Sequence, residues 1–192
     1  MKRRRSYTKV QRAAAEDATR QRIVSAIMAL HGEVGPARTT VSAVAERAGV
    51  ERLTVYRHFP DEPSMLLACC AHWSALHPMP HLPVRGDEPL SVCRRTILQL
   101  YTWYRANEAI LTNITADARR IPLLATLMAP LDSQLGRLAA ELNGMWKRRS
   151  AQRAATIRHA LEFSTWRSLT RIAPTDRRAA ALAASWLTPV NR

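Results

Sequence analysis

The residues with the clearest capacity for chemistry lie between Arg52 and His58, where basic, aromatic and hydroxyl side chains follow one another. A guanidinium group can donate two hydrogen bonds together to O6 and N7 of guanine, so Arg52 and Arg57 are candidate base-reading residues. Leu53 stands beside them and could contact the methyl group of thymine. These side chain types indicate recognition of nucleic-acid bases, provided that a helix presents them to a groove.

Two short helices around a tight turn are predicted to position these side chains. A hydroxyl of Thr39 or Thr40 can cap the first helix, and Gly49 can end it in a left-handed conformation. One buried face is marked by apolar residues at helical spacing: Val41, Val44, Ala45 and Ala48. The second helix has its own stripe, made of Val50, Leu53 or Thr54, Val55 and Phe59. A short gap forces the two helices to cross steeply, as in a helix-turn-helix.

The pattern T-V-x-x-V-A-x-x-A-G-V, followed by T-V-Y-x-H-F, resembles the DNA-binding signature of the TetR/AcrR family of bacterial transcriptional regulators. The resemblance covers residues 23–66, and the rest of the chain agrees only in length and helical character. It implies an all-α fold, with an N-terminal three-helix helix-turn-helix domain and a C-terminal helical domain for ligand binding and dimerisation. It also implies a homodimeric repressor of a palindromic double-stranded DNA operator, released by a small apolar effector. The alternative is a regulator of the same fold that responds to no ligand or that activates.

The resemblance adds contacts with phosphates or adjacent bases at four positions: Thr40, Thr54, Tyr56 and His58. The bland alternatives are a solvated helix face, core packing for Tyr56, and a purely capping role for Thr40. Three residues depart from the family pattern, which commonly has lysine where Glu62 stands, a small residue at Leu53, and serine or threonine at Glu51. The operator sequence therefore cannot be copied from a relative.

The charge of the chain also favours a polyanionic partner, since the formal net charge is +14 and the pI is about 11.2. Residues 1–60 hold 12 Lys and Arg against 5 Asp and Glu, a net of +7 in under a third of the chain. We expect residues 1–15 to form a basic arm that contacts DNA through Arg3, Arg4 and Arg5, although a solvated tail without a target is the alternative. Residues 16–60 are the predicted helix-turn-helix domain, and residues 61–192 the effector-binding and dimerisation domain.

Further helices are predicted from apolar spacing and from proline and glycine. The first should span Glu16 to Glu33 with a stripe of Ile23, Ile27, Leu30 and Val34, and Gly35-Pro36 should end it. Asp61 is a predicted N-cap for a helix from Met65 to Ala75, with Pro63 in its first turn. The remaining predicted helices span residues 90–105, 109–120, 122–146 with a kink or break at Pro130, 151–172 and 176–187.

The C-terminal region is rich in aromatic residues, and five of them are candidate ligand-binding residues: Trp73, Trp103, Tyr104, Phe163 and Trp166. Ordinary core packing is the alternative for each. Gln99, Asn113 and His159 are weaker, polar candidates. An association surface is predicted on the last two helices, from Leu161, Trp166, Leu169, the alanine-rich segment 179–184, Trp186 and Leu187.

Other classes of function find less support in the sequence. There is no signal peptide pattern or apolar run long enough for a membrane span, and three cysteines form no disulfide framework, so we expect a cytoplasmic protein. Cys69, Cys70 and His72 do not complete a metal site, although a thiol sensor remains an alternative. The sequence shows no phosphate loop or nucleophile motif, which predicts no enzyme and no cofactor. An enzyme using the aromatic pocket and a sequence-indifferent architectural DNA protein are the remaining alternatives.

Overall fold

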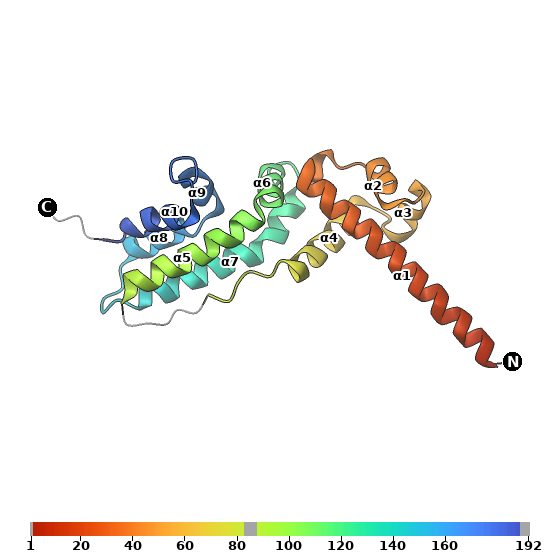
Figure 1. The fold of residues 1–192 in the computed structure, drawn as a ribbon, viewed down its shortest axis with the longest axis horizontal. Helices are drawn as coiled ribbons and strands as arrows, with labels where there is room; N and C mark the ends of the chain where they lie inside the picture. The colour runs from red at the N-terminus through yellow and green to blue at the C-terminus, as the bar shows by residue number, and fades with distance from the viewer. Residues whose placement is uncertain (1, 83–87, 189–192) are drawn as a thin grey trace. The chain divides into compact units, whose positions relative to one another are not determined.

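The computed structural model describes the backbone of residues 2–82 and 88–188, and the side chains of residues 11–82 and 88–188. This part of the chain contains ten α-helices and one 3-10 helix and no strand, which confirms the predicted all-α class (Figure 1). The helices are α1 (Lys2–Glu33), η1 (Pro36–Arg38), α2 (Val41–Ala48), α3 (Arg52–His58), α4 (Glu62–Leu76), α5 (Pro89–Ala106), α6 (Glu108–Asp117), α7 (Pro122–Gly144), α8 (Ala151–Ala160), α9 (Phe163–Leu169) and α10 (Asp176–Ser185).

Contacts divide the chain into two compact units. The N-terminal unit consists of Met1–His77 together with Thr112–Leu127, and the C-terminal unit consists of Pro78–Leu111 together with Met128–Arg192. The N-terminal unit therefore includes the second half of α6 and the start of α7, which are remote from α1 to α4 in sequence. The predicted domain boundaries, after residues 15 and 60, were assigned by expected function, and they stay a prediction.

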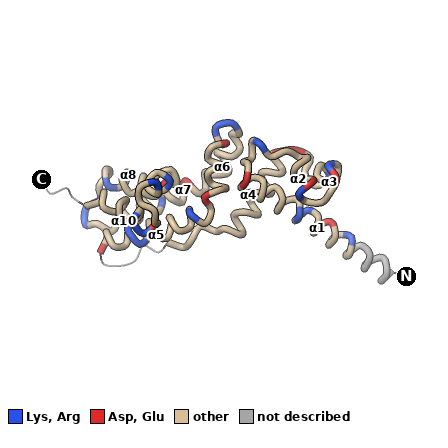
Figure 2. The backbone as a smooth tube through the Cα atoms, turned by 45° about the horizontal axis from the view of Figure 1, so that its top comes forward, with Lys and Arg blue, Asp and Glu red and all other residues tan. Residues whose placement is uncertain are grey.

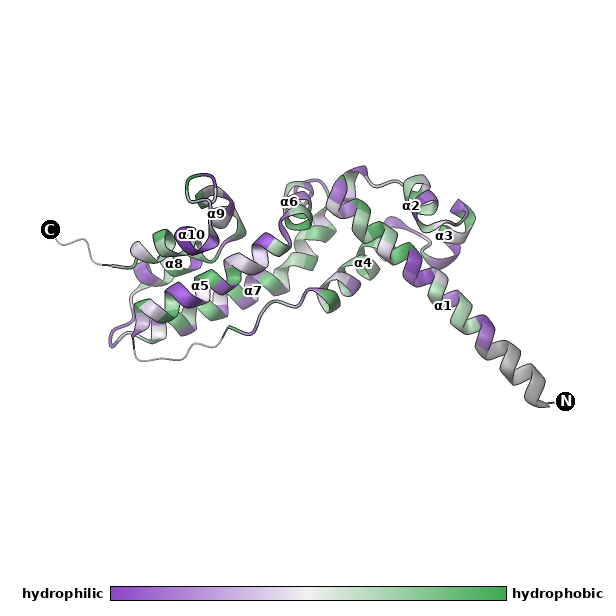
Figure 3. Ribbon diagram, viewed as in Figure 1, coloured by the Kyte–Doolittle hydropathy of each residue, from purple (hydrophilic) through white to green (hydrophobic). Residues whose placement is uncertain are grey.

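Helix α1 begins much earlier than predicted, at Lys2 instead of Glu16. The reason lies in composition, because residues 2–31 contain neither glycine nor proline and are rich in alanine, arginine and other good helix formers. In the coloured part of α1, Figure 3 shows hydrophilic and hydrophobic positions in turn, and the buried positions begin at Ile23. Whether residues 1–15 act as an arm on DNA stays a prediction, and the side chains of Arg3, Arg4 and Arg5 lie outside the described part.

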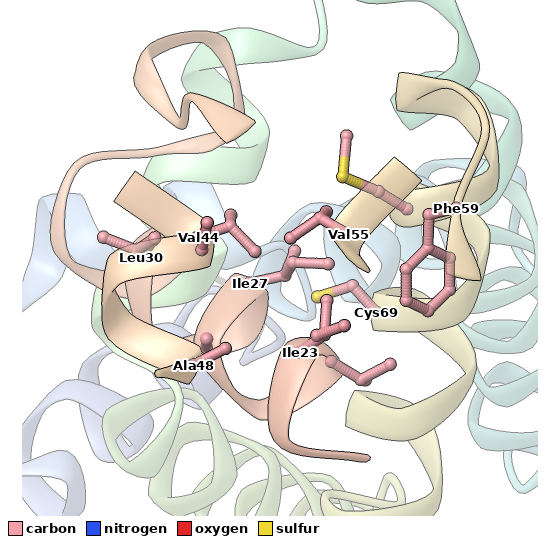
Figure 4. Packing of buried hydrophobic residues seen from close by; sticks show 12 residues of the cluster. Ile23, Ile27, Leu30, Val44, Ala48, Val55, Phe59 and Cys69 are labelled. Atoms are coloured by element: carbon pink, nitrogen blue, oxygen red, sulfur yellow. The ribbon is translucent and has the colours of Figure 1, made fainter. Parts of the chain in front are cut away.

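The core of the N-terminal unit is a single apolar cluster to which four helices contribute (Figure 4). Ile23, Ile27 and Leu30 of α1 face residues of α2, α3 and α4, and the predicted stripe on α1 is confirmed except for Val34, which is half-buried. The other labelled members in Figure 4 are Val44, Ala48, Val55, Phe59 and Cys69. Helices α2 and α4 both pack directly on α1, so α1 is the support for the rest of the unit.

The predicted caps of the short helices are confirmed. The Thr40 hydroxyl accepts a hydrogen bond from Ala43 N at 3.2 Å, and Asp61 with Ser64 forms a capping box at the start of α4. Gly49 ends α2 with φ at 63°, and the next residue, Val50, donates to Ala45 O at 3.0 Å in the Schellman pattern. A side-chain N-cap such as Thr40 or Asp61 stabilises a helix by about 1 kcal/mol.

Two predicted helices of the C-terminal region differ from the structure. A kink or break was predicted at Pro130, and no break occurs there, because Pro130 lies inside the continuous helix α7. The predicted helix over residues 151–172 is wrong, because it divides into α8 and α9 with Glu162 in an extended conformation between them. At this division, the Tyr101 hydroxyl donates to Ala160 O at 2.8 Å and the Tyr104 hydroxyl donates to Leu161 O at 2.7 Å. Side chains of α5 thus satisfy carbonyl groups that a continuing helix would have bonded.

The alanine-rich face of α10 is also placed differently from the prediction. It packs along α5 of the same chain, and Ala179, Ala180, Ala183 and Ala184 are all buried there. Small side chains permit this close approach of two helices. Leu161, Trp166 and Leu169 are buried in the same unit. These residues, predicted as an association surface, are therefore core residues of one chain.

A buried histidine and a buried thiol meet inside the N-terminal unit. His31 Nδ1 of α1 lies 3.5 Å from Cys69 Sγ of α4. Burial lowers the pKa of His31 to about 4, with Asp117 opposing the shift, and burial raises the pKa of Cys69 to about 12. The imidazole is therefore neutral and the thiol protonated near pH 7, which disfavours Cys69 as a reactive sensor.

We expect His31 to make the fold sensitive to acid. A base whose pKa is lower in the folded state contributes stability above the unfolded pKa of 6.5, and loses it as the pH falls toward about 4. Between pH 7 and about pH 5, wild type should lose about 2 kcal/mol that His31→Gln does not lose. Urea unfolding followed by circular dichroism at both pH values measures this difference.

His81→Gln is the matched control, because it makes the same substitution at an exposed histidine. Equal pH dependence in wild type and His31→Gln would contradict the assignment of this effect to His31.

Candidate DNA-binding surface

Helix α3 carries most of the predicted DNA-binding residues on its outer face. Val55 within the helix and Phe59 at its C-terminal end are buried in the apolar cluster. The side chains on the opposite face are exposed: Arg52, Leu53, Tyr56 and Arg57. Thr54 and His58 lie at the edges of this face and are half-buried. The sequence pattern thus separates the face of α3 that packs from the face that is free to contact DNA.

Leu53 and Tyr56 give the exposed face of α3 an apolar component. Leu53 is 59% exposed and Tyr56 is 43% exposed, and their three-residue spacing places them on the same side of the helix. The apolar stripe of α3 therefore does not include Leu53, which the sequence had left open. An exposed leucine between two arginines is suited to contact a thymine methyl group while the guanidinium groups bond to neighbouring bases.

Helix α2 adds Thr40 at its N-terminus. The Thr40 side chain is exposed, and its oxygen is engaged as a cap by Ala43 N. A hydroxyl that accepts one hydrogen bond still has its own proton to donate. Thr40 can thus cap α2 and donate to a phosphate oxygen in the same conformation, so the two roles weighed from the sequence are compatible.

The sequence reasoning missed Arg20, whose guanidinium carbon lies 4.9 Å from the centre of the Phe59 ring. This cation–π contact holds a positive charge beside the C-terminal end of α3. Arg20 is exposed but lies three residues before the buried Ile23, on the same face of α1, and this spacing is the signal that could have identified it. Arg47 has a different role, because both its terminal nitrogens bond to Glu33 at 2.6 and 2.7 Å and join α2 to α1.

Acidic residues flank α3 at both ends. Glu51 occupies the N-cap position of α3 without a side-chain cap bond, and Glu62 begins α4. Both side chains are exposed. Glu62 lies where a helix N-terminus stabilises negative charge, so the structure accounts for its presence without a phosphate contact. Figure 2 shows that basic positions occur in both units of the chain and not only beside α3.

Four of the five predicted ligand-binding residues come together in the C-terminal unit. The ring centre of Tyr104 lies 5.3 Å from Phe163, 6.0 Å from Trp166 and 5.6 Å from Trp103. Tyr104 and Trp166 are fully buried, whereas Trp103 and Phe163 are half-buried. Trp73 belongs to the N-terminal unit, where its ring stacks on His77.

The polar groups of the buried aromatic residues are engaged within the fold. Trp166 Nε1 donates to Asp176 Oδ1 at 3.0 Å, and Arg105 Nε donates to the same carboxylate at 3.0 Å. Of the weaker polar candidates, Gln99 and His159 are exposed instead of buried. Asn113 is half-buried in the N-terminal unit and is bonded to α1. A role of these residues in ligand binding stays a prediction.

The described residues contain neither a candidate metal site nor a candidate membrane span. No group of three or more His, Cys, Asp or Glu side chains could hold a metal ion there. The helices of the described part include none that is long and apolar enough to cross a membrane. Burial raises the pKa of Cys93, like that of Cys69, to about 12.

The fold and the exposed face of α3 define an all-helical protein with an N-terminal helix-turn-helix. Residues 23–69 match the family model described as "Bacterial regulatory proteins, tetR family". A curated relative, an uncharacterized HTH-type transcriptional regulator of Mycobacterium bovis, is 27% identical over 138 residues, which is 71% of this chain and 68% of the relative. The N-terminal helix-turn-helix of this chain, residues 23–69, is therefore of the type found in the TetR family of bacterial transcriptional regulators.

Solved structures have the same fold. A proposed regulator of fatty acid metabolism from Clostridium perfringens superposes with a TM-score of 0.65 at 14% identity, covering 86% of this chain and 96% of that one. A proposed TetR-family regulator from Mesorhizobium loti superposes with a TM-score of 0.62 at 17% identity, covering 90% of this chain and 96% of that one. At these identities the likeness shows the fold alone, and both matches extend well beyond the helix-turn-helix.

We expect the two arginines of α3 to determine base preference. Arg52→Ala or Arg57→Ala should weaken binding to the preferred DNA site by about 1–3 kcal/mol and relax the preference at one base position. Tyr56→Phe removes a hydroxyl that could reach a phosphate, and should weaken binding to all sequences about equally. Binding to a set of single-base variants of the site measures both effects.

Arg47→Ala serves as the comparison, because Arg47 is held by Glu33 and should not read bases. Parental selectivity in both α3 arginine variants would show that direct readout lies elsewhere.

Proposed function

We propose that this protein is a homodimeric transcriptional repressor that binds a palindromic operator and is released by a small apolar ligand. The observation that carries the proposal is the outer face of α3, where Arg52, Leu53, Tyr56 and Arg57 are exposed together on a helix anchored from its opposite side. Such a face fits the major groove, where base edges and thymine methyl groups are accessible.

Dimerisation is supported by the size of the reading surface and by exposed apolar residues of the C-terminal unit. One recognition helix covers only a few base pairs, so useful specificity needs two copies about one helical turn of DNA apart, or a multiple of that distance. Ile172, Leu182 and Trp186 are 74%, 37% and 41% exposed in the single chain. Because the alanine face of α10 is covered by α5, these residues are better candidates for the dimer contact.

Ligand release is supported by the aromatic cluster of the C-terminal unit. Trp103 and Phe163 are half-buried beside the fully buried Tyr104 and Trp166, so an apolar ligand could contact ring edges without replacing the hydrogen bonds of the buried pair. The similar Clostridium perfringens protein is described as a proposed regulator of fatty acid metabolism, which is consistent with an apolar effector class. The ligand shifts the protein away from DNA only if it binds the released state more tightly.

The proposal is tested by selecting DNA fragments from the genome that encodes the chain, and by competing a selected palindrome against bulk DNA. Strong preference for the palindrome supports a sequence-specific regulator, whereas equal binding would indicate an architectural DNA protein. Transcription from the selected promoter with and without the protein then separates repression from activation. Release by fatty acids or other small apolar compounds, measured on the same fragment, tests the ligand step.

We expect DNA binding to depend strongly on salt, because each neutralised phosphate releases counterions and adds about −0.9 to the log–log slope. Deleting Lys2 to Arg5 should weaken binding and flatten this slope by up to about 4, since four positive charges are removed. Titrations of one operator fragment at several salt concentrations measure the slope. An unchanged slope after the deletion would show that the arm does not contact DNA.

We expect the double substitution Leu182→Glu and Trp186→Glu to give a folded monomer with reduced operator affinity. Both side chains are exposed in the single chain, so charge there should oppose association more than folding. Sedimentation measures the mass, and circular dichroism reports the fold. Leu67→Glu is the control, because Leu67 is 50% exposed on α4 and should not affect association. A wild-type protein that sediments as a monomer at micromolar concentration would refute the dimer.

A further inference from the structure

The C-terminal end of α1 is bonded by a side chain from a distant part of the sequence. Asn113 Nδ2, on the half of α6 that belongs to the N-terminal unit, donates to His31 O at 3.0 Å and to Gly32 O at 2.8 Å. The last carbonyl groups of a helix have no partner within the helix and need one from elsewhere. Asn113 supplies that partner across 81 and 82 residues of sequence.

The turn that follows α1 is bonded by a second side chain of the same helix. Asp117 Oδ2 accepts a hydrogen bond from Ala37 N at 2.9 Å, at the start of η1. Gly35 precedes this point with φ at 90°, and a Cβ on Gly35 would lie 2.7 Å from Asp117 Oδ2. The turn thus combines a positive φ with close approach to the Asp117 carboxylate, and both features require glycine at position 35.

This turn determines where the helix-turn-helix begins. The Thr39 hydroxyl donates to Gly35 O at 2.9 Å, and Thr40 then caps α2. The three-residue segment Gly49–Glu51 connects α2 to α3, so a displacement of the turn is passed to the recognition helix. Asn113 and Asp117 therefore fix both sides of the connection between α1 and α2.

We propose that Asn113 and Asp117 are positioning residues for operator recognition, although neither contacts DNA. Together they hold the segment from the end of α1 to the start of α2 in the geometry that places α3. The inference rests on the proposed DNA-binding function, and it extends the DNA-binding unit beyond residues 23–69 to α6. Base-specific contacts require accurate placement of α3, whereas attraction to phosphates does not, so the two residues should affect preference for the operator more than general DNA binding.

The test compares pairs of substitutions that change charge equally in the full-length protein. Asp117→Ala removes the acceptor, whereas Asp117→Asn removes the same charge and retains a side-chain oxygen that can accept from Ala37 N. Asn113→Asp places a carboxylate against two carbonyl oxygens. Asn107→Asp makes the same change in the C-terminal unit, where Asn107 Nδ2 donates to Trp103 O at 2.8 Å.

We expect Asp117→Ala and Asn113→Asp to lower affinity for a selected operator about tenfold or more, and affinity for unrelated DNA by less than about threefold. Asp117→Asn and Asn107→Asp should keep the wild-type ratio of the two affinities. Exchange of the Ala37 amide proton, measured by NMR without DNA, should accelerate in Asp117→Ala and stay slow in Asp117→Asn. Thermal unfolding of each variant is measured in parallel, so that binding is compared at a temperature at which every variant is folded. If Asn113→Asp does not fold, the test uses Asp117→Ala, Asp117→Asn and Asn113→Ala instead.

Wild-type affinity ratios in Asp117→Ala and Asn113→Asp would overturn the inference while leaving the proposed function intact. An equal loss in Asp117→Asn and Asp117→Ala would also overturn it, since charge and not the hydrogen bond would then be responsible. A wild-type protein that shows no preference for any DNA sequence would overturn the proposed function itself, and the inference with it.

Discussion

The candidate DNA-binding surface depends on the burial of Val55 and Phe59 in the cluster around α1. A helix of seven residues is too short to be stable alone in water, because the cost of forming its first turn is not recovered. Two buried side chains on one face of α3 supply the missing stability through contacts with α1, α2 and α4. Packing is confined to that face, so the four exposed side chains on the other face do not contribute to the core: Arg52, Leu53, Tyr56 and Arg57. Because α3 has one buried face and one exposed face, the first face stabilises the helix and the second is left free to contact DNA.

Local signals were sufficient to predict this part of the fold. The caps at Thr40 and Asp61 and the left-handed end at Gly49 involve hydrogen bonds between residues at most five apart, so the sequence alone specifies them. The division between α8 and α9 could not be predicted in this way. It coincides with hydroxyl groups of Tyr101 and Tyr104, which are 59 and 57 residues from the carbonyl groups they bond. The hydrogen bonds of Asn113 and Asp117 to the end of α1 and to η1 were missed for the same reason, because their partners lie about 80 residues away.

Apolar periodicity identifies the buried face of a helix but does not say what covers that face. The alanine face of α10 was predicted to meet a second chain, yet it packs on α5 of the same chain. Asp176 reinforces this arrangement, because its carboxylate accepts from Arg105 of α5 and from Trp166 of α9 at the first turn of α10. One half-buried carboxylate thereby connects three helices, and the C-terminal unit has a packed core within a single chain.

The carboxylates at both ends of α3 suggest how such a basic protein could still discriminate between DNA sequences. A net charge of +14 attracts any DNA, and attraction of that kind carries no sequence information. Glu51 and Glu62 are exposed beside the recognition helix, where each opposes the approach of a phosphate. These two charges therefore reduce the general attraction close to the predicted base-reading side chains. If α3 enters the major groove, its bonds to bases must outweigh that local repulsion, and only a matching site supplies enough of them. The acidic residues would then increase specificity by penalising contact with every other sequence.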